Sequence, residues 1–400
     1  MQYLYVITIF LLFGIIFWIL RRYLRERKVS EDAYKPQYPK KKNFEFLDIV
    51  RSRPFNKKDK SFTGQDESWQ EELKNVGEQL KKHKVGHVFL VHGTFAGDDP
   101  FDLVSMVGKT IPGMSEMIQK TIRGFVHKRQ RAFFREMGNF TNEYIGILED
   151  AWGSEIEIVP FVWSSANHHL ARVKGAIDLI SKIANTLLLY NKGERVLLIG
   201  HSHAGQLFVI MSQMLSSKKL RKKFLNIASR AGYNTALLMD YIMTLKQYGP
   251  DMVTLGTPVR YEWMLGKNMR LLHFINHRGK EPFGGGAEGI LFTRDGDYIQ
   301  QYGVAGSDLL SPISNERELN ILLDDMLGVG SNLSLWRRRI KERRRIHNVG
   351  RSLLIDYKDS AIYPNFLKTL FGHGVYTRTD VMLFNFKLIA KHFYGDMPRM

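Results

Sequence analysis

Short apolar runs, many of them ending at or near a glycine, recur along the chain between longer segments with helical spacing. The runs are His87–Val91, Glu155–Trp163, Arg195–Ile199, Met252–Leu255, Arg270–Ile275, Tyr298–Val304 and Ser352–Tyr357. Continuously apolar strands are typical of a parallel sheet that is buried on both faces. The pattern therefore predicts an α/β fold, in which a mostly parallel sheet carries helices on both faces.

The first apolar segment differs from these strands in its length. Residues Tyr3–Leu20 contain no charged side chain, and about 18 to 20 such residues in a helix cross a ~30 Å hydrocarbon layer. A cleaved signal peptide and a buried core helix are the alternatives, but no basic residue precedes the segment and Arg21 and Arg22 follow it. We therefore expect a single transmembrane anchor, with the rest of the chain on the cytoplasmic side.

The remaining pattern divides the chain into three parts. Residues 1–29 form the predicted anchor with its basic flank, and residues 30–82 a linker followed by a polar helix at Glu67–Lys82. Residues 83–400 form the α/β domain. Two stretches, near 98–139 and 311–350, are longer than ordinary connections, and we expect them to be insertions at the rim of the sheet.

Composition narrows the classes of chemistry and of partner. The chain has no cysteine, which excludes disulfides, thiolate catalysis and thiolate metal sites. Its formal net charge of +18 favours contact with anionic lipid headgroups or nucleic acid. Because no nucleic-acid-binding motif is present, we expect no nucleic-acid partner. The basic segments Lys218–Lys223 and Trp336–His347 are interpreted as solvated surface or as contacts with an anionic membrane.

The segment around Ser202 carries the strongest chemical signal. The apolar run Arg195–Ile199 leads into Gly200–Gly205, and apolar residues at helical spacing follow at once. A serine at the apex of a strand–turn–helix unit is typical of a nucleophile elbow, whose sharp bend requires small residues two positions before and after the serine. Gly200 and Ala204 occupy those positions. The alternative is a turn that binds phosphate or has no chemical role.

With this serine turn and the further motifs given below, the chain resembles lipases and esterases of the α/β-hydrolase superfamily, from about Val85 to Tyr394. Ala204 departs from the family pattern, which has a second glycine there. The resemblance implies an α/β-hydrolase fold and nucleophilic acyl chemistry without a cofactor or metal. The motifs that carry it are VHGT at Val91–Thr94, FVWS at Phe161–Ser164 followed by Arg172, GHSHAG at Gly200–Gly205, LGTP at Leu255–Pro258 and GHGVYT at Gly372–Thr377.

In hydrolases of this type, two backbone N–H groups stabilise the charge that develops on the substrate carbonyl oxygen, forming an oxyanion hole. The resemblance implies that one donor is the residue after the nucleophile, which is His203 here. The other donor lies on the loop after an earlier strand, where Thr94 is our candidate and Phe95 its neighbour.

A serine hydroxyl needs a general base, and in this superfamily the histidine follows the acid, which follows the serine. Among thirteen histidines we expect His373, which lies between two glycines and precedes an apolar final helix. His347 and His392 are the alternatives.

The acid that orients this histidine is expected to be Asp308, which lies on a Gly-Ser turn between Ser202 and His373. Asp295 and Asp297 compete with it, although Asp-Gly-Asp is typical of a hairpin turn. Glu281 is a further alternative.

The sequence thus predicts a membrane-anchored serine hydrolase that cleaves carboxylic esters, with lipids among the candidate substrates. Two alternatives stay open. One is an acyltransferase that uses the same three side chains, and the other is a non-catalytic scaffold at the membrane with a hydrolase fold. The sequence leaves the oligomeric state open.

Overall fold

A central sheet organises the computed structural model, which describes residues 44–50, 55–56, 61–62, 67–93, 140–190, 195–277, 296–302, 313–327, 346–357 and 372–395. Seven strands lie in the order β1-β9-β8-β7-β6-β4-β5, and every neighbouring pair is parallel. The strands are β1 (Phe44–Val50), β4 (Val85–Val91), β5 (Glu157–Phe161), β6 (Arg195–His201), β7 (Asp251–Leu255), β8 (Arg270–Asn276) and β9 (Arg351–Tyr357).

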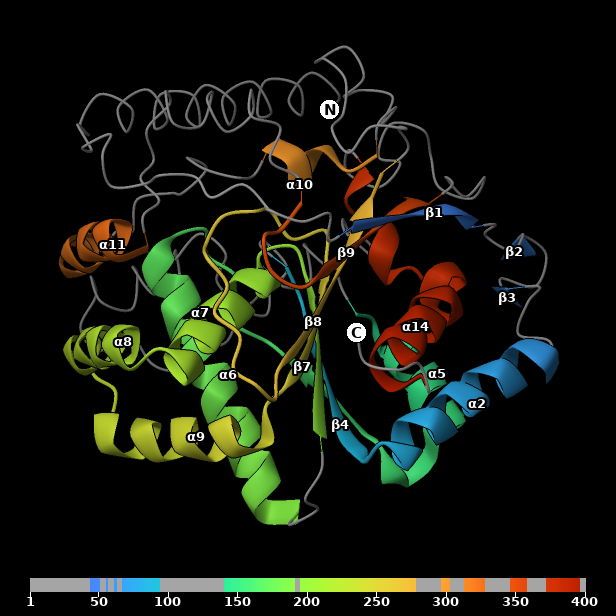
Figure 1. Cartoon of the computed structure of the whole chain (residues 1–400), viewed down its shortest axis with the longest axis horizontal. Coiled ribbons are helices and arrows are strands. Elements are labelled where there is room, and N and C mark those ends of the chain that lie inside the picture. Colours follow the sequence, from blue (N-terminus) through green and yellow to red (C-terminus); the bar gives the residue numbers. More distant parts are fainter. Residues whose placement is uncertain are drawn as a thin grey trace, which may run out of the picture.

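Helices cover the sheet on both sides, and Figure 1 shows the sheet nearly edge-on between the two layers. One layer contains α6 (His169–Tyr190), α7 (Ala204–Ser216), α8 (Lys218–Arg230), α9 (Thr235–Tyr248) and α11 (Ser314–Leu327). The other contains α2 (Glu67–Lys82), α5 (Asn142–Trp152) and α14 (Thr379–Tyr394). Short elements complete the described residues: β2 (Phe55–Asn56), β3 (Ser61–Phe62), η2 (Gly153–Glu155), α10 (Tyr298–Tyr302) and η5 (Val375–Thr377). The predicted α/β fold with a parallel sheet is confirmed.

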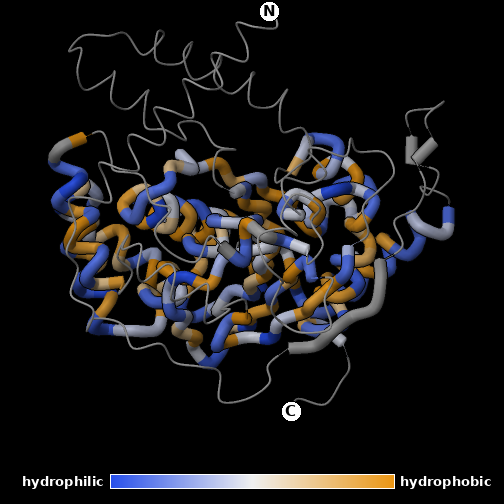
Figure 2. Tube along the Cα trace, turned by 90° about the horizontal axis from the view of Figure 1, so that it is seen from above, coloured by the Kyte–Doolittle hydropathy of each residue, from blue (hydrophilic) through white to orange (hydrophobic). Residues whose placement is uncertain are grey.

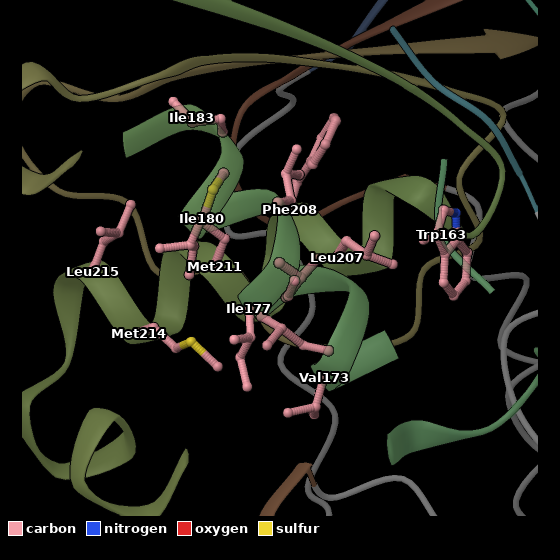
Figure 3. Packing of buried hydrophobic residues seen from close by; sticks show 14 of the residues in the cluster. Trp163, Val173, Ile177, Ile180, Ile183, Leu207, Phe208, Met211, Met214 and Leu215 are labelled. Carbon is pink, nitrogen blue, oxygen red and sulfur yellow. The ribbon is translucent and has the colours of Figure 1, made fainter. Parts of the chain in front are cut away.

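The core lies in two parts, one on each face of the sheet. In Figure 3 side chains from α6 and α7 pack together, among them Ile177, Leu207 and Met211. All residues of α7 from Ala204 to Leu215 are buried, and each fully buried large apolar side chain contributes about 1.5–3 kcal/mol. The tube in Figure 2 alternates between hydrophilic and hydrophobic residues along the helices, as expected for amphipathic covering layers. The helix that follows Ser202 is therefore held firmly from all sides.

The opposite layer is fixed by a tryptophan in α5. The indole Nε1 of Trp152 donates a hydrogen bond to the carbonyl oxygen of Leu73 in α2, at 2.9 Å. Its ring meets Phe386 of α14 edge-on, with centroids 4.9 Å apart. These contacts join the three helices of the layer, and thereby position the loop that precedes α14.

One predicted strand is wrong. The sequence run Tyr298–Val304 was expected to be a strand, but its described part forms the short helix α10 (Tyr298–Tyr302). The cause lies just before the helix, where the Oδ1 atom of Asp297 accepts a hydrogen bond from the backbone N–H of Gln300 at 2.8 Å. A carboxylate that satisfies a free N–H group in this way caps a helix N-terminus.

The region expected to be a linker contributes a strand. Within residues 30–66, β1 (Phe44–Val50) pairs in parallel with β9 at the edge of the sheet. Two acidic residues, Glu45 and Asp48, interrupt its apolar pattern. Charged residues are common in edge strands, where they discourage pairing with another chain.

Several predicted segments lie outside the described residues: the anchor at 1–29, the insertion at 98–139 and most of the basic segment Trp336–His347. Part of the second insertion is described, because it forms α11 (Ser314–Leu327), which packs on α6. Across the described part of the chain, every helix is too short or too polar to span a bilayer.

Candidate active site

The candidate site lies where the chain reverses its direction through the sheet. The connection from β4 leads outward to β5, whereas the connection that leaves its neighbour β6 leads the other way, to β7. Two adjacent parallel strands whose connections diverge leave a crevice at their carboxyl ends, where ligands bind in open α/β sheets. Gly93 follows β4 and Ser202 follows β6, so both residues lie at this crevice.

Ser202 has the strained backbone expected of a serine at the apex of a sharp turn. Its φ angle is +56°, in the left-handed region that costs a non-glycine residue roughly 1–3 kcal/mol. Two hydrogen bonds hold this conformation: Ser202 N–H donates to the carbonyl oxygen of Leu255 at 2.8 Å, and the hydroxyl of Thr257 donates to the Ser202 carbonyl at 2.7 Å. The helix α7 begins two residues later, at Ala204.

The small residues around the turn approach one another as the sequence predicts. A Cβ atom built on Gly200 would lie 3.2 Å from the Cβ of Ala204 and 2.7 Å from the ring of Phe208. There is therefore no room for a larger side chain at position 200, and Ala204 is small enough to allow this close approach.

The loop after β4 comes close to the serine. A Cβ atom built on Gly93 would lie only 2.8 Å from the Cβ of Ser202. The base of this loop is fixed by Trp163, whose backbone N–H donates to Nε2 of His92 at 3.2 Å and whose indole donates to the His92 carbonyl at 3.0 Å. Thr94, the predicted oxyanion donor, and its neighbour Phe95 lie outside the described residues, so their role stays a prediction.

His373 is held by a buried carboxylate. Its Nδ1 atom lies 2.7 Å from Oδ2 of Asp297, and both side chains are buried. A carboxylate accepts the hydrogen bond, so Nδ1 carries the proton and Nε2 of the neutral ring keeps its lone pair. Nε2 is buried and has no hydrogen-bond partner among the described residues. The imidazole therefore has the tautomer of a general base.

The same carboxylate is fixed by two further donors. Its Oδ2 atom accepts from the Tyr376 hydroxyl at 2.7 Å, and Oδ1 accepts from the Gln300 N–H described above. The backbone N–H of Asn276, at the end of β8, in turn donates to the Tyr376 hydroxyl at 2.8 Å. These bonds fix the direction of the Asp297 carboxylate.

Among the described residues, the carboxylate partner of His373 thus comes from the Asp-Gly-Asp segment. Asp308 lies outside the described residues, as do the other two alternatives, Asp295 and Glu281. The signal in the sequence that favours Asp297 is its position after β8 and directly before the short helix α10. The sequence Asp-Gly-Asp by itself is typical of a hairpin turn.

His201 links the loop that carries His373 to the turn that carries Ser202. Its Nε2 atom lies 2.9 Å from the carbonyl oxygen of His373, and since a carbonyl only accepts, Nε2 donates. The two imidazole rings have centroids 4.6 Å apart. Because His201 immediately precedes Ser202, this contact places the His373 loop beside the candidate nucleophile.

His203, a predicted oxyanion donor, is the N-cap residue immediately before α7 and is buried. Burial lowers the pKa of its imidazole well below the ordinary value, and the positive charges of Arg172 and Arg260 lower it further, followed by His373 and His201. His203 is therefore neutral at neutral pH. Arg172, from the sequence motif that follows Ser164, is fully buried and donates to the Tyr261 hydroxyl at 3.0 Å.

His347, an alternative to His373 as base, occupies a different site. It stacks on His273 with ring centroids 3.9 Å apart, accepts from the Trp263 indole at 3.2 Å and donates from Nε2 to the Thr257 carbonyl at 3.0 Å. Burial lowers its pKa to about 4. Both ring nitrogens are engaged, so His347 supports the turn behind Ser202. His392, the other alternative, lies in the last turn of α14.

The turn of Ser202 and His203 and the loop of His373 thus lie next to each other, and the carboxylate bound to His373 is that of Asp297, which the sequence offered as an alternative to Asp308. Among the described residues, no three side chains of the metal-binding types form a cluster. A scan against protein-family models, a search of curated proteins and a search of solved structures each gave no match to this chain.

Proposed function

We propose that this chain is a serine ester hydrolase with an α/β-hydrolase fold, in which Ser202, His373 and Asp297 form the catalytic triad. Two observations support the proposal: a serine in a left-handed turn, and a histidine whose Nδ1 is bound by a buried carboxylate and whose carbonyl is bound by His201, the residue before that serine. A serine hydroxyl becomes nucleophilic only when a base removes its proton, and this arrangement supplies one.

In the proposed reaction, Ser202 Oγ attacks the ester carbonyl carbon while its proton passes to His373 Nε2. The negative charge on the substrate oxygen is stabilised by the backbone N–H groups of His203 and Thr94. Each such donor contributes roughly 2.7–4 kcal/mol of transition-state stabilisation. Asp297 stabilises the imidazolium form of His373, and the imidazolium then protonates the departing alcohol oxygen.

Water releases the acyl group from Ser202 in the second half of the reaction. His373 Nε2 removes a proton from the water molecule, whose oxygen attacks the acyl-serine carbonyl. Collapse of this intermediate returns the proton to Ser202 Oγ and yields a carboxylic acid. Transfer to another alcohol or to an amine follows the same steps with that acceptor in place of water.

The sequence features outside the described residues extend the proposal to a membrane setting. The apolar segment Tyr3–Leu20 and the net charge of +18 favour attachment to an anionic membrane, with the hydrolase domain on its cytoplasmic face. Lipid esters are then the substrates nearest to the site. This preference rests on the N-terminal segment and on the resemblance to lipases, not on a described pocket.

Covalent labelling with a fluorophosphonate probe tests the nucleophile directly. We expect the wild-type protein to be labelled and Ser202→Ala to lose labelling, together with hydrolysis of short p-nitrophenyl esters. Ser181→Ala is the matched control, because among the described residues this hydroxyl donates within α6, to the carbonyl of Ile177 at 2.9 Å. Equal labelling of wild type and Ser202→Ala, or none in either, contradicts the proposal. Adding an alcohol acceptor and analysing the products separates hydrolysis from acyl transfer.

A further inference from the structure

The turn Leu255–Gly256–Thr257, at the end of β7, lies between the two halves of the candidate triad. On one side it receives the backbone of Ser202, through the Leu255 carbonyl and the Thr257 hydroxyl, at 2.8 and 2.7 Å. On the other side it touches the acid: a Cβ atom built on Gly256 would lie 2.7 Å from Oδ2 of Asp297. The turn therefore lies between Ser202 and Asp297 and contacts both.

Thr257 makes the largest number of these connections. Besides its hydroxyl bond to Ser202, its carbonyl accepts from Nε2 of His347 at 3.0 Å and, in a longer contact, from the side chain of Gln300 at 3.4 Å. The backbone N–H of Gln300 is the donor that fixes Oδ1 of Asp297. A single residue thus contacts the nucleophile turn and the helix that positions the acid.

The close approach of Thr257 to the turn explains a glycine of the serine motif. A Cβ atom built on Gly205 would lie 2.1 Å from the Thr257 hydroxyl oxygen and 2.6 Å from its methyl carbon. Any side chain at position 205 would displace Thr257 from Ser202. The glycine that follows Ala204 in the motif is therefore matched to this threonine.

We propose that Thr257 is a positioning residue, whose hydroxyl holds Ser202 in its left-handed conformation and aligns the nucleophile with the Asp297–His373 pair. This inference rests on the proposed function, because it concerns the alignment of that same triad. The Ser202 backbone is strained, and the hydrogen bond from Thr257 is one of the contacts that offset the strain. Without the hydroxyl, the serine Oγ moves away from the line of attack.

Replacement by valine and by serine separates the hydroxyl from the rest of the side chain. Thr257→Val keeps the shape and removes the donor, so we expect kcat to fall by about 10- to 100-fold with KM within twofold of wild type, as for a nucleophile displaced by a fraction of an ångström. Thr257→Ser keeps the donor, and we expect its kcat to lie within about threefold of wild type.

A threonine within β7, Thr254, provides the control. The Thr254 hydroxyl donates to Nδ1 of His273 at 2.6 Å, whereas the Thr257 hydroxyl donates to Ser202. Thr254→Val also removes a buried hydroxyl bond, but we expect only a lower melting temperature, with kcat unchanged when assayed below it. Gly205→Ala is the independent variant, since it displaces Thr257 without altering its hydroxyl, and we expect the kcat loss of Thr257→Val.

The outcomes are distinguishable. A kcat loss in Thr257→Val and Gly205→Ala, together with retained kcat in Thr257→Ser and Thr254→Val, supports the positioning role. If Thr257→Val does not fold, Gly205→Ala and Thr257→Ser decide the question in the same way. Wild-type kcat in either displacing variant, or an equal loss in Thr257→Ser, overturns the role of Thr257. Failure of the probe to label the wild-type protein overturns the proposed function itself, and the positioning role with it.

Discussion

Oδ2 of Asp297 meets Nδ1 of His373 at 2.7 Å, although 76 residues separate them in the chain. The contact joins a segment that follows β8 to the loop before α14, and it leaves Nε2 of the imidazole available as a base. It also identifies Asp297 as the carboxylate partner of His373, although the sequence Asp-Gly-Asp around it is typical of a hairpin turn.

The first prediction concerns this carboxylate. Asp297→Asn keeps the shape but favours the wrong histidine tautomer, so kcat should fall by about 10³- to 10⁴-fold, as when the acid of a serine triad is neutralised. Asp308→Asn is the matched control and should retain kcat within about twofold. Steady-state hydrolysis of a soluble ester measures both. A larger loss of kcat in Asp308→Asn than in Asp297→Asn would mean that Asp308, the residue expected from the sequence, is the acid.

A second prediction concerns the tyrosine that binds the acid. Tyr376→Phe removes the donor to Asp297 and leaves the buried N–H of Asn276 without its acceptor. We expect a loss of about 1–3 kcal/mol in the free energy of unfolding, measured by urea denaturation, together with a lower kcat.

Tyr357→Phe is the control for a lost buried hydroxyl. The Tyr357 hydroxyl donates to Oδ1 of Asn385 at 2.7 Å, whereas that of Tyr376 donates to Asp297. This variant should lose stability while its kcat stays at the wild-type value. Equal kcat values for the two variants would mean that the Tyr376 hydroxyl serves stability alone.

A third prediction follows from the stacked histidines behind the serine turn. Burial lowers the pKa of His347 to about 4 and lowers that of His273 well below its ordinary value, with the charge of His347 as a second cause. Each Nδ1 already accepts a hydrogen bond, from Trp263 and from Thr254. Protonation would therefore break a bond in each ring.

The sign of the pH effect follows from these lowered values. The unfolded chain binds protons near pH 6.5, whereas the folded His347 does so only near pH 4. Stability contributed by the neutral ring is therefore present above pH 6.5 and is lost as the pH falls toward 4. The loss is on the order of 3 kcal/mol for this one group.

Urea denaturation at a series of pH values measures the effect. In His347→Gln the amide can accept from Trp263 and donate to Thr257 without titrating, so the decline between pH 6.5 and 4 should become shallower. It should not vanish, because His273 and His203 also have lowered pKa values. An unchanged slope in His347→Gln would contradict the assignment of the neutral form to His347.

The interior of the sheet was predictable because its strands carry the signal themselves. The strands β6 and β7 are mostly apolar and are buried almost throughout, as expected for strands of a sheet covered on both faces. The edge strand β1 carries charges and escaped notice for that reason. The turn at Ser202 was predictable because its requirement for small residues is local, between Gly200 and Ala204.

The acid and the supporting turn depend on distant contacts, which local patterns do not contain. In the sequence, Asp297 is typical of a hairpin turn. Only the structure shows that it accepts from the Gln300 N–H and binds His373. The LGTP motif around Thr257 was recognisable, but its bond to Ser202 is visible only once β6 and β7 are known to be neighbours. The order of the strands, rather than any single motif, determines these roles.

The last prediction tests the close approach of the β4 loop to the nucleophile. Gly93→Ala places a methyl group where only 2.8 Å separates it from the Ser202 Cβ, so one of the two chains must shift. We expect kcat to fall by about 100-fold or more, because a displacement near 1 Å misaligns the serine and the oxyanion donors.

Gly146→Ala in α5 is the matched control, because no neighbouring atom of the described residues lies within 4 Å of the added methyl. It should raise the free energy of unfolding by up to about 1 kcal/mol, since alanine favours a helix interior over glycine, and leave kcat unchanged. Wild-type kcat in Gly93→Ala would mean that the loop can move away from Ser202 without cost to the reaction, and the oxyanion role proposed for its next residue, Thr94, would then lose its support.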